Sequence, residues 1–144
     1  FAPKAFIFTV GPALVEFGKI LGSDAEGVMG VVAWQRSERM PKAQDFSFRY
    51  KRKYGHDAGV HAAFGYGAGQ VLEAAVRLAG STDHAAVREQ LYTMVFNSLL
   101  GIYDVDANGR QVGKNNYLLQ WQGKDRRLVE PARIAESKLI YPMP

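Results

Sequence analysis

The sequence contains no cysteine among its 144 residues. This absence excludes a disulfide framework, a thiolate nucleophile and a zinc site built on cysteine. Long hydrophobic runs are also missing, since stretches such as Ala5–Phe8 are far shorter than the ~20 residues that a membrane-spanning helix needs. Phe1 opens the chain without an initiator Met, and no charged N-terminal region followed by a long apolar segment is visible. We therefore expect a mature or excised piece of a protein.

The charge of the chain is only weakly biased. The 18 Lys and Arg residues oppose 14 Asp and Glu residues, a formal net charge of +4. This balance falls short of the basic surface that is typical of nucleic-acid-binding proteins, so we expect no nucleic-acid partner. The one dense group of cations precedes Gly55 and fits the solvated end of a helix, where cations interact well with the helix dipole. That group consists of Arg49, Lys51, Arg52 and Lys53.

The first third of the chain has the pattern of a β-α-β unit. The segment Ala5–Val10 (AFIFTV) is apolar and rich in β-forming residues, which predicts a strand buried on both faces. Leu14–Leu21 has apolar residues at helical spacing, and Val28–Trp34 is a second apolar, β-branched run. This alternation predicts an α/β fold in which the two strands are parallel.

Three helices are predicted next. Ala43–Tyr54 has aromatic residues spaced four apart and ends at Gly55. Ala62–Ala79 is longer and less polar, and its first half contains three glycines, each of which costs about 1 kcal/mol relative to Ala in a helix. These glycines predict that another segment packs closely against the helix. Ser81 or Asp83 can cap the third helix.

The pattern becomes β from residue 96 onward. Leu99–Val105 and Tyr117–Trp121 are apolar runs, and Asn108-Gly109 between them readily adopts the positive φ of a tight turn. We predict that the two runs pair as a β-hairpin.

Two motifs resemble ligand sites but lack required parts. Residues 104–109 (DVDANG) match the opening of a calcium loop, yet the twelfth position is Asn115 instead of Glu. Gly65–Gly69 resembles a dinucleotide fingerprint, but Gln70 stands where the third Gly is required and no strand precedes it. The histidines lack the spacing that would place two metal ligands on one helical face. We therefore predict no metal and no cofactor and, because no nucleophile motif such as G-x-S-x-G occurs, no enzyme.

Three aromatic residues are candidates for contact with a ligand. Trp34 ends the second predicted strand, and Phe64 and Tyr66 lie near the start of the long helix. Strand ends and helix starts of parallel α/β sheets are where ligand crevices form. Packing in the core is the alternative explanation for each of them.

Four stretches in fixed order resemble the type I periplasmic binding proteins of the branched-chain amino acid (Leu/Ile/Val) receptor family, the solute-binding components of ABC importers. They are Leu21–Gly30, Phe48–Gly55, Ala62–Leu91 and Asp106–Gln122. The resemblance implies the C-terminal part of a two-lobe α/β fold, with parallel Rossmann-like sheets flanked by helices and a C-terminal β-hairpin. It further implies that residues 1–34 belong to the second lobe, 35–113 to the first and 114–144 again to the second, with the N-terminal portion of both lobes absent.

The family also implies a function. Its members are exported to the periplasm, close their lobes around a small solute and deliver it to a membrane permease. Amino-acid-binding members place an acidic residue in the turn after the strand that opens this chain, and here the turn contains none. This favours a solute without a cation at that position, such as an aromatic or other carboxylic acid, over an amino acid, with Trp34 and Phe64 as an apolar wall. The residues of that turn are Thr9, Val10, Gly11 and Pro12.

Two further points follow from the resemblance. A ligand-sensing domain of a receptor or regulator with the same fold is the alternative function. A fragment of each lobe would also leave sheet edges open and apolar faces uncovered, so we expect a paired or strand-exchanged oligomer.

Overall fold

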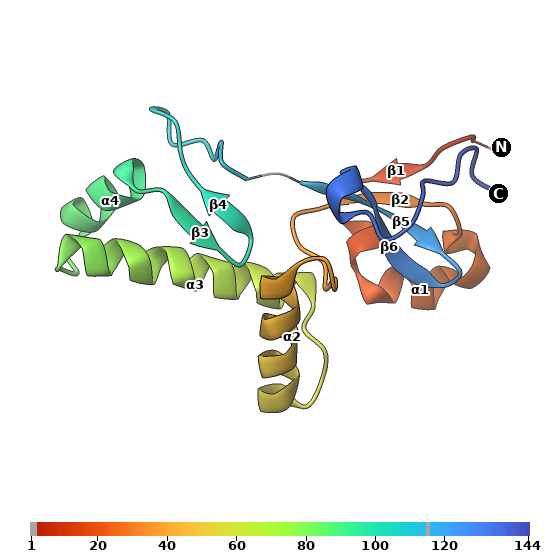
Figure 1. The fold of residues 1–144 in the computed structure, drawn as a ribbon, viewed down its shortest axis with the longest axis horizontal. Coiled ribbons are helices and arrows are strands. Elements are labelled where there is room, and N and C mark those ends of the chain that lie inside the picture. The colour runs from red at the N-terminus through yellow and green to blue at the C-terminus, as the bar shows by residue number, and fades with distance from the viewer. Residues whose placement is uncertain (1–2, 115) are drawn as a thin grey trace. The chain divides into compact units, whose positions relative to one another are not determined.

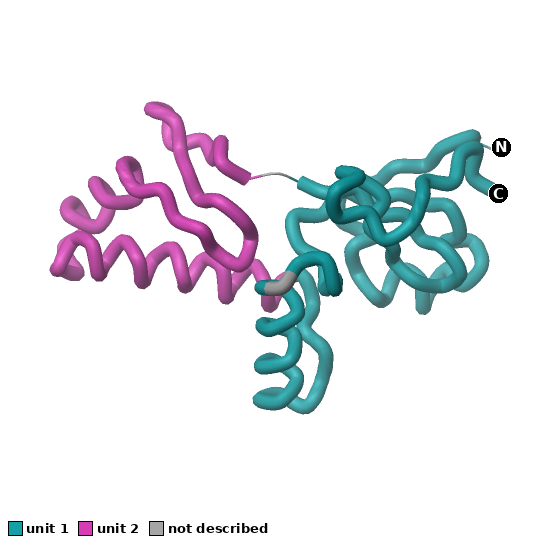
Figure 2. Tube along the Cα trace, in the orientation of Figure 1, with its two compact units in different colours: residues 1–60, 116–144 teal, residues 61–115 magenta. Residues whose placement is uncertain are grey.

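The computed structural model describes residues 3–114 and 116–144, which form two compact units. Unit 1 lies within residues 1–60 and 116–144, and unit 2 lies within residues 61–115 (Figure 2). Each unit has its own sheet, of four strands in unit 1 and two strands in unit 2.

Unit 1 is built on a mixed sheet with the strand order β1-β2-β5-β6 (Figure 1). Its strands are β1 (Ile7–Phe8), β2 (Met29–Val32), β5 (Tyr117–Gln122) and β6 (Asp125–Glu130). β1 and β2 are parallel, whereas β5 is antiparallel to both β2 and β6. Helix α1 (Val15–Leu21) connects β1 to β2, between the 3-10 turns η1 (Gly11–Ala13) and η2 (Gly22–Ala25). The predicted parallel β-α-β unit is therefore confirmed.

The prediction that the first strand is buried on both faces is wrong. Ile7 and Phe8 are 59% and 42% exposed. The reason is that β1 lies at the edge of the sheet and has β2 as its one neighbouring strand. The apolar composition predicted the strand correctly, but it carried no information about which segments would cover it.

The core of unit 1 lies between the sheet and the segment that contains η1 and α1. A ring of Trp121 fills this space so tightly that a Cβ on Gly18 of α1 would lie 2.2 Å from a ring carbon. Gly18 is therefore the residue that lets α1 approach the sheet. The buried side chains of this core are Ala13, Ala25, Val32, Leu119, Trp121 and Leu128.

Helix α2 (Pro41–Tyr54) follows β2. Proline at its first position suits a helix start, since the missing N–H would have no partner there in any case. Phe46 is buried and packs edge-on against Trp34, with ring centroids 5.8 Å apart. The helix ends at Gly55, whose φ of +79° is left-handed and whose N–H donates to Lys51 O. This end is the one predicted from the sequence.

Unit 2 contains helices α3 (Val60–Ala79) and α4 (His84–Thr93) and the strands β3 (Phe96–Ser98) and β4 (Gly101–Tyr103). Asp83 caps α4, because its carboxylate accepts hydrogen bonds from the N–H groups of Ala85 and Ala86. A small buried cluster of Ala75, Val87 and Met94 joins α3 to α4.

The predicted close packing at the glycines of α3 is confirmed at one position. A Cβ on Gly67 would lie 2.7 Å from Leu100 Cγ, so the glycine allows the β3–β4 turn to approach the helix. Gly65 and Gly69 have no described neighbour within 4 Å of such a Cβ, apart from the backbone of their own helix. Two of the three glycines therefore lower the stability of the helix without a packing gain in this structure.

The predicted pairing of Leu99–Val105 with Tyr117–Trp121 is wrong. The first run contributes β4, which pairs with β3 so that Phe96 lies opposite Tyr103. The second run is β5, which pairs with β2 and β6 in unit 1. β5 has two strand partners there and buries Leu119 completely, so pairing with a single strand of unit 2 would expose it.

Each unit also contains a tight turn with positive φ angles. The predicted turn at residues 106–109 does form, with Gly109 at φ +76°, and among the described residues it closes with a bridge between Val105 and Gln111. The C-terminal hairpin is instead β5–β6, whose turn uses the positive φ of Gly123 and Lys124.

Candidate functional site

The candidate solute site begins at the carboxyl end of the parallel strands β1 and β2. Thr9 and Val10 directly follow β1, and Trp34 lies two residues after β2. Because the strands are parallel, both ends lie at the same edge of the sheet, which is where ligands bind in open α/β sheets. Val10 is 56% exposed, so the turn offers side chains and backbone to a solute.

The turn Thr9–Pro12 is held in place from the sheet side. The indole Nε1 of Trp121 donates a hydrogen bond of 3.0 Å to Pro12 O. The guanidinium of Arg126 donates to the next carbonyl, that of Ala13. Both donors come from the C-terminal hairpin, so residues more than a hundred positions apart fix the shape of this turn.

Trp34 follows the carboxyl end of β2. It is 4% exposed, and its ring packs on Phe46. Its indole nitrogen is buried, and no hydrogen-bond acceptor for it is present among the residues that the structure describes. The structure therefore gives Trp34 the surroundings of a core residue.

The other two predicted site residues lie on helix α3 in unit 2. Phe64 and Tyr66 are 37% and 39% exposed. The ammonium Nζ of Lys114 lies 5.3 Å from the centroid of the Phe64 ring, within the range of a cation–π contact. Burial lowers the pKa of Lys114. The structure thus places the turn and Trp34 in one unit, and Phe64 with Tyr66 on one helix of the other.

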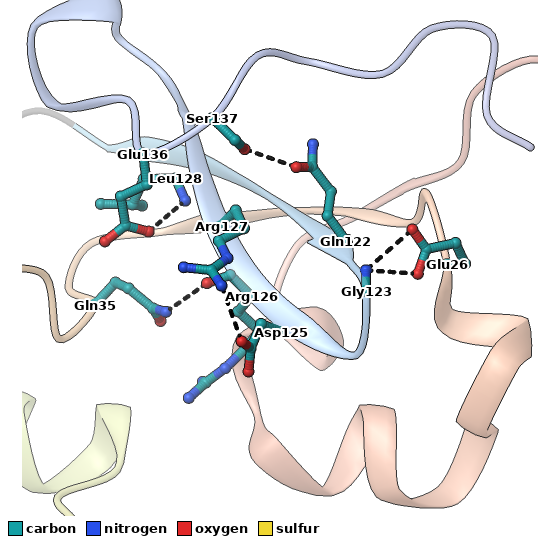
Figure 3. Close-up of polar contacts among 10 residues, drawn as sticks. All are labelled: Glu26, Gln35, Gln122, Gly123, Asp125, Arg126, Arg127, Leu128, Glu136 and Ser137. Carbon is teal, nitrogen blue, oxygen red and sulfur yellow. Dashed lines mark hydrogen bonds and ion pairs between the residues drawn. The ribbon is translucent and has the colours of Figure 1, made fainter.

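A polar groove of about 620 Å³ in unit 1 was not predicted from the sequence. Gln35 Nε2 donates to Arg126 O at 3.2 Å, and Glu136 accepts from Leu128 N at 3.0 Å, which fixes two of its walls (Figure 3). Residues 35 and 126 are 91 positions apart, so no local pattern indicates that they meet. The lining includes four arginines, Arg36, Arg39, Arg126 and Arg127, and three carboxylates, Glu38, Asp125 and Glu136.

Charge in this groove is partly compensated. Arg127 pairs with Asp125 at 3.0 Å, and both side chains are about half exposed or more, so the pair contributes little stability. Burial lowers the pKa of Arg126, while Glu16 and Asp125 oppose that shift. A guanidinium nonetheless stays charged in proteins, so Arg126 remains a donor to the Ala13 carbonyl.

The calcium-like stretch is a turn stabilised by its own side chain. Asp106 Oδ1 accepts hydrogen bonds of 2.9 Å from the N–H groups of Asn108 and Arg110, which is the usual role of Asp in tight turns. The twelfth position of the loop, Asn115, lies outside the described residues. Within residues 3–114 and 116–144, no three His, Cys, Asp or Glu side chains gather as metal ligands would.

The glycine-rich stretch 65–69 lies inside α3, and its N–H groups belong to the helix. It is therefore not placed as the phosphate-binding turn between a strand and a helix. Among the described residues, no helix has the length and apolar character needed to cross a membrane.

A comparison with protein families gives one match. The family model described as periplasmic binding protein matches residues 5–126.

Solved structures with a similar fold include three from bacterial transport systems. A protein assigned as a branched-chain amino acid ABC transporter from Silicibacter pomeroyi has a TM-score of 0.82 and 20% identity over 94% of this chain. A leucine binding protein from Thermotoga maritima has a TM-score of 0.72 and 28% identity over 85% of it. An ABC transporter solute binding protein from R. palustris, in complex with benzoate, has a TM-score of 0.64 and 21% identity over 88% of it. The chain spans 40%, 35% and 33% of the lengths of these three proteins.

Proposed function

Because this chain belongs to the periplasmic binding protein family, we propose that it takes part in the extracytoplasmic capture of a small organic solute for an ABC importer. The membrane permease of that importer is the proposed partner, and the periplasm is the proposed location. The similarity to the leucine binding protein of Thermotoga maritima supports a role in binding. The proposal accordingly includes no catalytic step.

We also assign the chain to the two lobes of such a protein. Residues 1–34 and 114–144 form part of the second lobe, and residues 35–113 form part of the first. The similarity to the Silicibacter pomeroyi structure, which extends over 94% of this chain, supports this assignment. The compact units differ from this assignment at residues 35–60, which lie in unit 1.

The single observation that carries the choice of solute is the turn Thr9–Pro12. Its first two residues, Thr9 and Val10, are exposed at the carboxyl edge of β1 and β2, whereas Pro12 is buried, and the turn contains no carboxylate. A solute with an α-ammonium group would lose its water there without gaining a counter-charge, and an unpaired charge is costly to desolvate. We therefore propose a carboxylic acid without an ammonium group, of the chemical kind to which the benzoate of the R. palustris protein belongs.

The proposed contacts are those predicted from the sequence. Thr9, Val10, Gly11 and Pro12 supply the turn, whose backbone N–H groups and hydroxyl suit an anionic solute, although the proline has no N–H to offer. Trp34 is retained as a predicted contact, although its burial against Phe46 favours a role in the core. Phe64 and Tyr66 supply exposed aromatic surface, which suits an apolar or aromatic body.

A gain-of-charge variant tests this proposal. Phenylpropanoate and phenylalanine differ only in the α-ammonium group, and saturation-transfer NMR detects binding of either one even at millimolar affinity. We expect the wild type to prefer phenylpropanoate and Val10→Asp to shift the preference toward phenylalanine. Val15→Asp is the matched control, because Val15 is also an exposed valine but lies in α1. If Val10→Asp kept the wild-type preference for phenylpropanoate over phenylalanine, the turn would not be part of the solute site.

The expected self-association is a separate proposal. Phe6, Ile7, Phe8 and Val10 on and around the edge strand β1 are 38–59% exposed. An open strand edge with apolar side chains favours pairing with another chain. We propose that this edge pairs with a second copy. Light scattering coupled to gel filtration tests it, and a single species at the monomer mass of 15.9 kDa across the concentration range would contradict it.

A further inference from the structure

One face of helix α2 combines cations with an exposed aromatic side chain, and we propose that this face binds an anionic lipid bilayer. The face consists of Phe48, Arg49, Lys51 and Arg52 and is called the α2 basic face below. The proposal goes beyond solute capture, because none of these residues belongs to the proposed solute site.

The positive charge of the chain is concentrated around α2. Residues 35–54 contain seven Lys and Arg against two Asp and Glu, a net charge of +5, whereas the whole chain carries +4. The rest of the chain therefore carries a net charge of −1. A basic region of this density attracts an anionic surface.

Phe48 lies in the middle of this basic region and is 65% exposed. Phe46, two residues earlier, is 4% exposed and packs on Trp34, so the two rings lie on opposite sides of the helix. Lys51 and Arg52 follow Phe48 by one turn and share its side. The Arg52 guanidinium lies 6.0 Å from the centroid of the Phe48 ring. The Phe48 ring is therefore flanked by cations and largely exposed to solvent.

The last turn of α2 repeats this combination. Tyr54 is 54% exposed, and Lys53 Nζ lies 5.4 Å from the centroid of its ring. Aromatic rings flanked by long Lys and Arg side chains are typical of surfaces that sit at lipid headgroups. There the rings enter the interface, and the flexible cations remain at the level of the phosphates.

Helix capping explains part of this composition. Lys51, Arg52 and Lys53 occupy the last turn of α2, where cations interact favourably with the helix dipole. The dipole does not account for Phe48, which lies before that turn and exposes an apolar ring to water. The aromatic residue therefore needs a second explanation.

Local ion pairs neutralise the face only in part. Arg49 pairs with Asp45 at 2.9 Å, and Lys51 pairs with Asp57 at 3.1 Å. The side chains of all four are exposed by half or more, so these pairs are weak and exchange readily for other anions.

A bilayer fits this face better than an acidic protein does. Phe48 and Lys51 also line a groove of about 470 Å³, but Asp45 and Asp57 line the same groove, so its charge is mixed and does not specifically attract an acidic side chain. A bilayer that contains anionic lipids supplies both a negative surface for the cations and an apolar layer for the ring.

Flotation with lipid vesicles tests the proposal on the 144-residue chain. We expect binding to vesicles that contain about one third phosphatidylglycerol at low ionic strength, none to pure phosphatidylcholine, and release as added salt screens the charges. Arg52→Gln with Lys53→Gln should weaken binding about 30-fold, since each cation near an anionic surface contributes about a fivefold factor. Phe48→Ser should weaken it with no change of net charge.

The matched control is Lys19→Gln with Lys138→Gln, which removes two exposed lysines outside α2. It should retain wild-type binding. Equal losses in the control and in the α2 variant would show that only net charge matters and would overturn the proposal. An absence of binding to the anionic vesicles would also overturn it, as would preferential binding to a single-stranded oligonucleotide or to permease in neutral lipid.

Discussion

The side chain of Gln120 and the backbone of Ile140 form a two-way hydrogen-bonded pair. Gln120 Nε2 donates to Ile140 O at 2.9 Å, and Ile140 N donates to Gln120 Oε1 at 2.9 Å. The same amide nitrogen also donates to Gly27 O at 3.0 Å. Gln120 is completely buried, so this one side chain joins the C-terminal segment to the sheet of unit 1.

Gln120→Met should destabilise unit 1 by about 2–3 kcal/mol. Methionine has a similar shape but cannot replace the four hydrogen bonds of this side chain, the fourth of which Gln122 Nε2 donates to Gln120 Oε1, so the partners on Gly27 and Ile140 are left unsatisfied in a buried place. Urea denaturation measures the free energy of unfolding. Gln44→Met, at an exposed glutamine of α2, is the control and should change it by less than about 0.5 kcal/mol. Equal effects at both positions would contradict the assigned role of Gln120.

Two glycine-to-alanine variants should change the free energy of unfolding in opposite directions. Gly18→Ala would place a Cβ 2.2 Å from the Trp121 ring, and overpacking a core of this kind costs about 2 kcal/mol. Gly69→Ala meets no described neighbour and should stabilise α3 by about 1 kcal/mol. Thermal unfolding of the two variants tests this pair, and a stabilised Gly18→Ala would show that Trp121 does not pack as described.

Asp83→Ala should destabilise unit 2 by about 1 kcal/mol. The substitution removes the acceptor for the N–H groups of Ala85 and Ala86 at the start of α4. Asp83→Asn keeps an acceptor oxygen and should cost much less. Chemical denaturation followed by circular dichroism distinguishes the two. If the Asn variant lost as much as the Ala variant, charge at this position would matter more than capping.

Lys114 should make the stability of unit 2 depend on alkaline pH. Burial lowers the pKa of Lys114 in the folded chain below its ordinary 10.5, so the unfolded chain binds more protons between those two values. Stability must therefore rise with pH through that window, as the folded chain no longer holds a partly buried charge.

The measurement is the difference in unfolding free energy between the wild type and Lys114→Met. We expect the wild type to gain stability relative to the variant as pH rises toward 10.5. Lys19→Met corrects for the loss of one lysine charge. A constant difference between the wild type and Lys114→Met over the whole range would contradict the burial of Lys114.

Local sequence patterns predicted most elements of this fold. The position of Gly55 correctly indicated where α2 ends, and Asp83 was correctly indicated as a cap of α4. Such features depend on a single residue and its near neighbours in the chain, which do not change with tertiary context.

Pairing between distant segments was not predictable in the same way. The turn at Asn108-Gly109 was predicted correctly, but the strand after it pairs in the other unit, where β2 and β6 give it a strand partner on each side. The polar groove beside Arg126 was missed for the same reason, since Gln35 and Arg126 are far apart in the sequence. The support of the turn at Pro12 by Trp121 likewise has no local pattern.

The central claim is that the turn Thr9–Pro12, which has no carboxylate, selects a solute without an ammonium group. Isothermal titration of the chain with benzoate and with leucine tests it most directly. The account predicts saturable heat with benzoate and none with leucine at the same concentrations. Tight binding of leucine together with no binding of benzoate would contradict it.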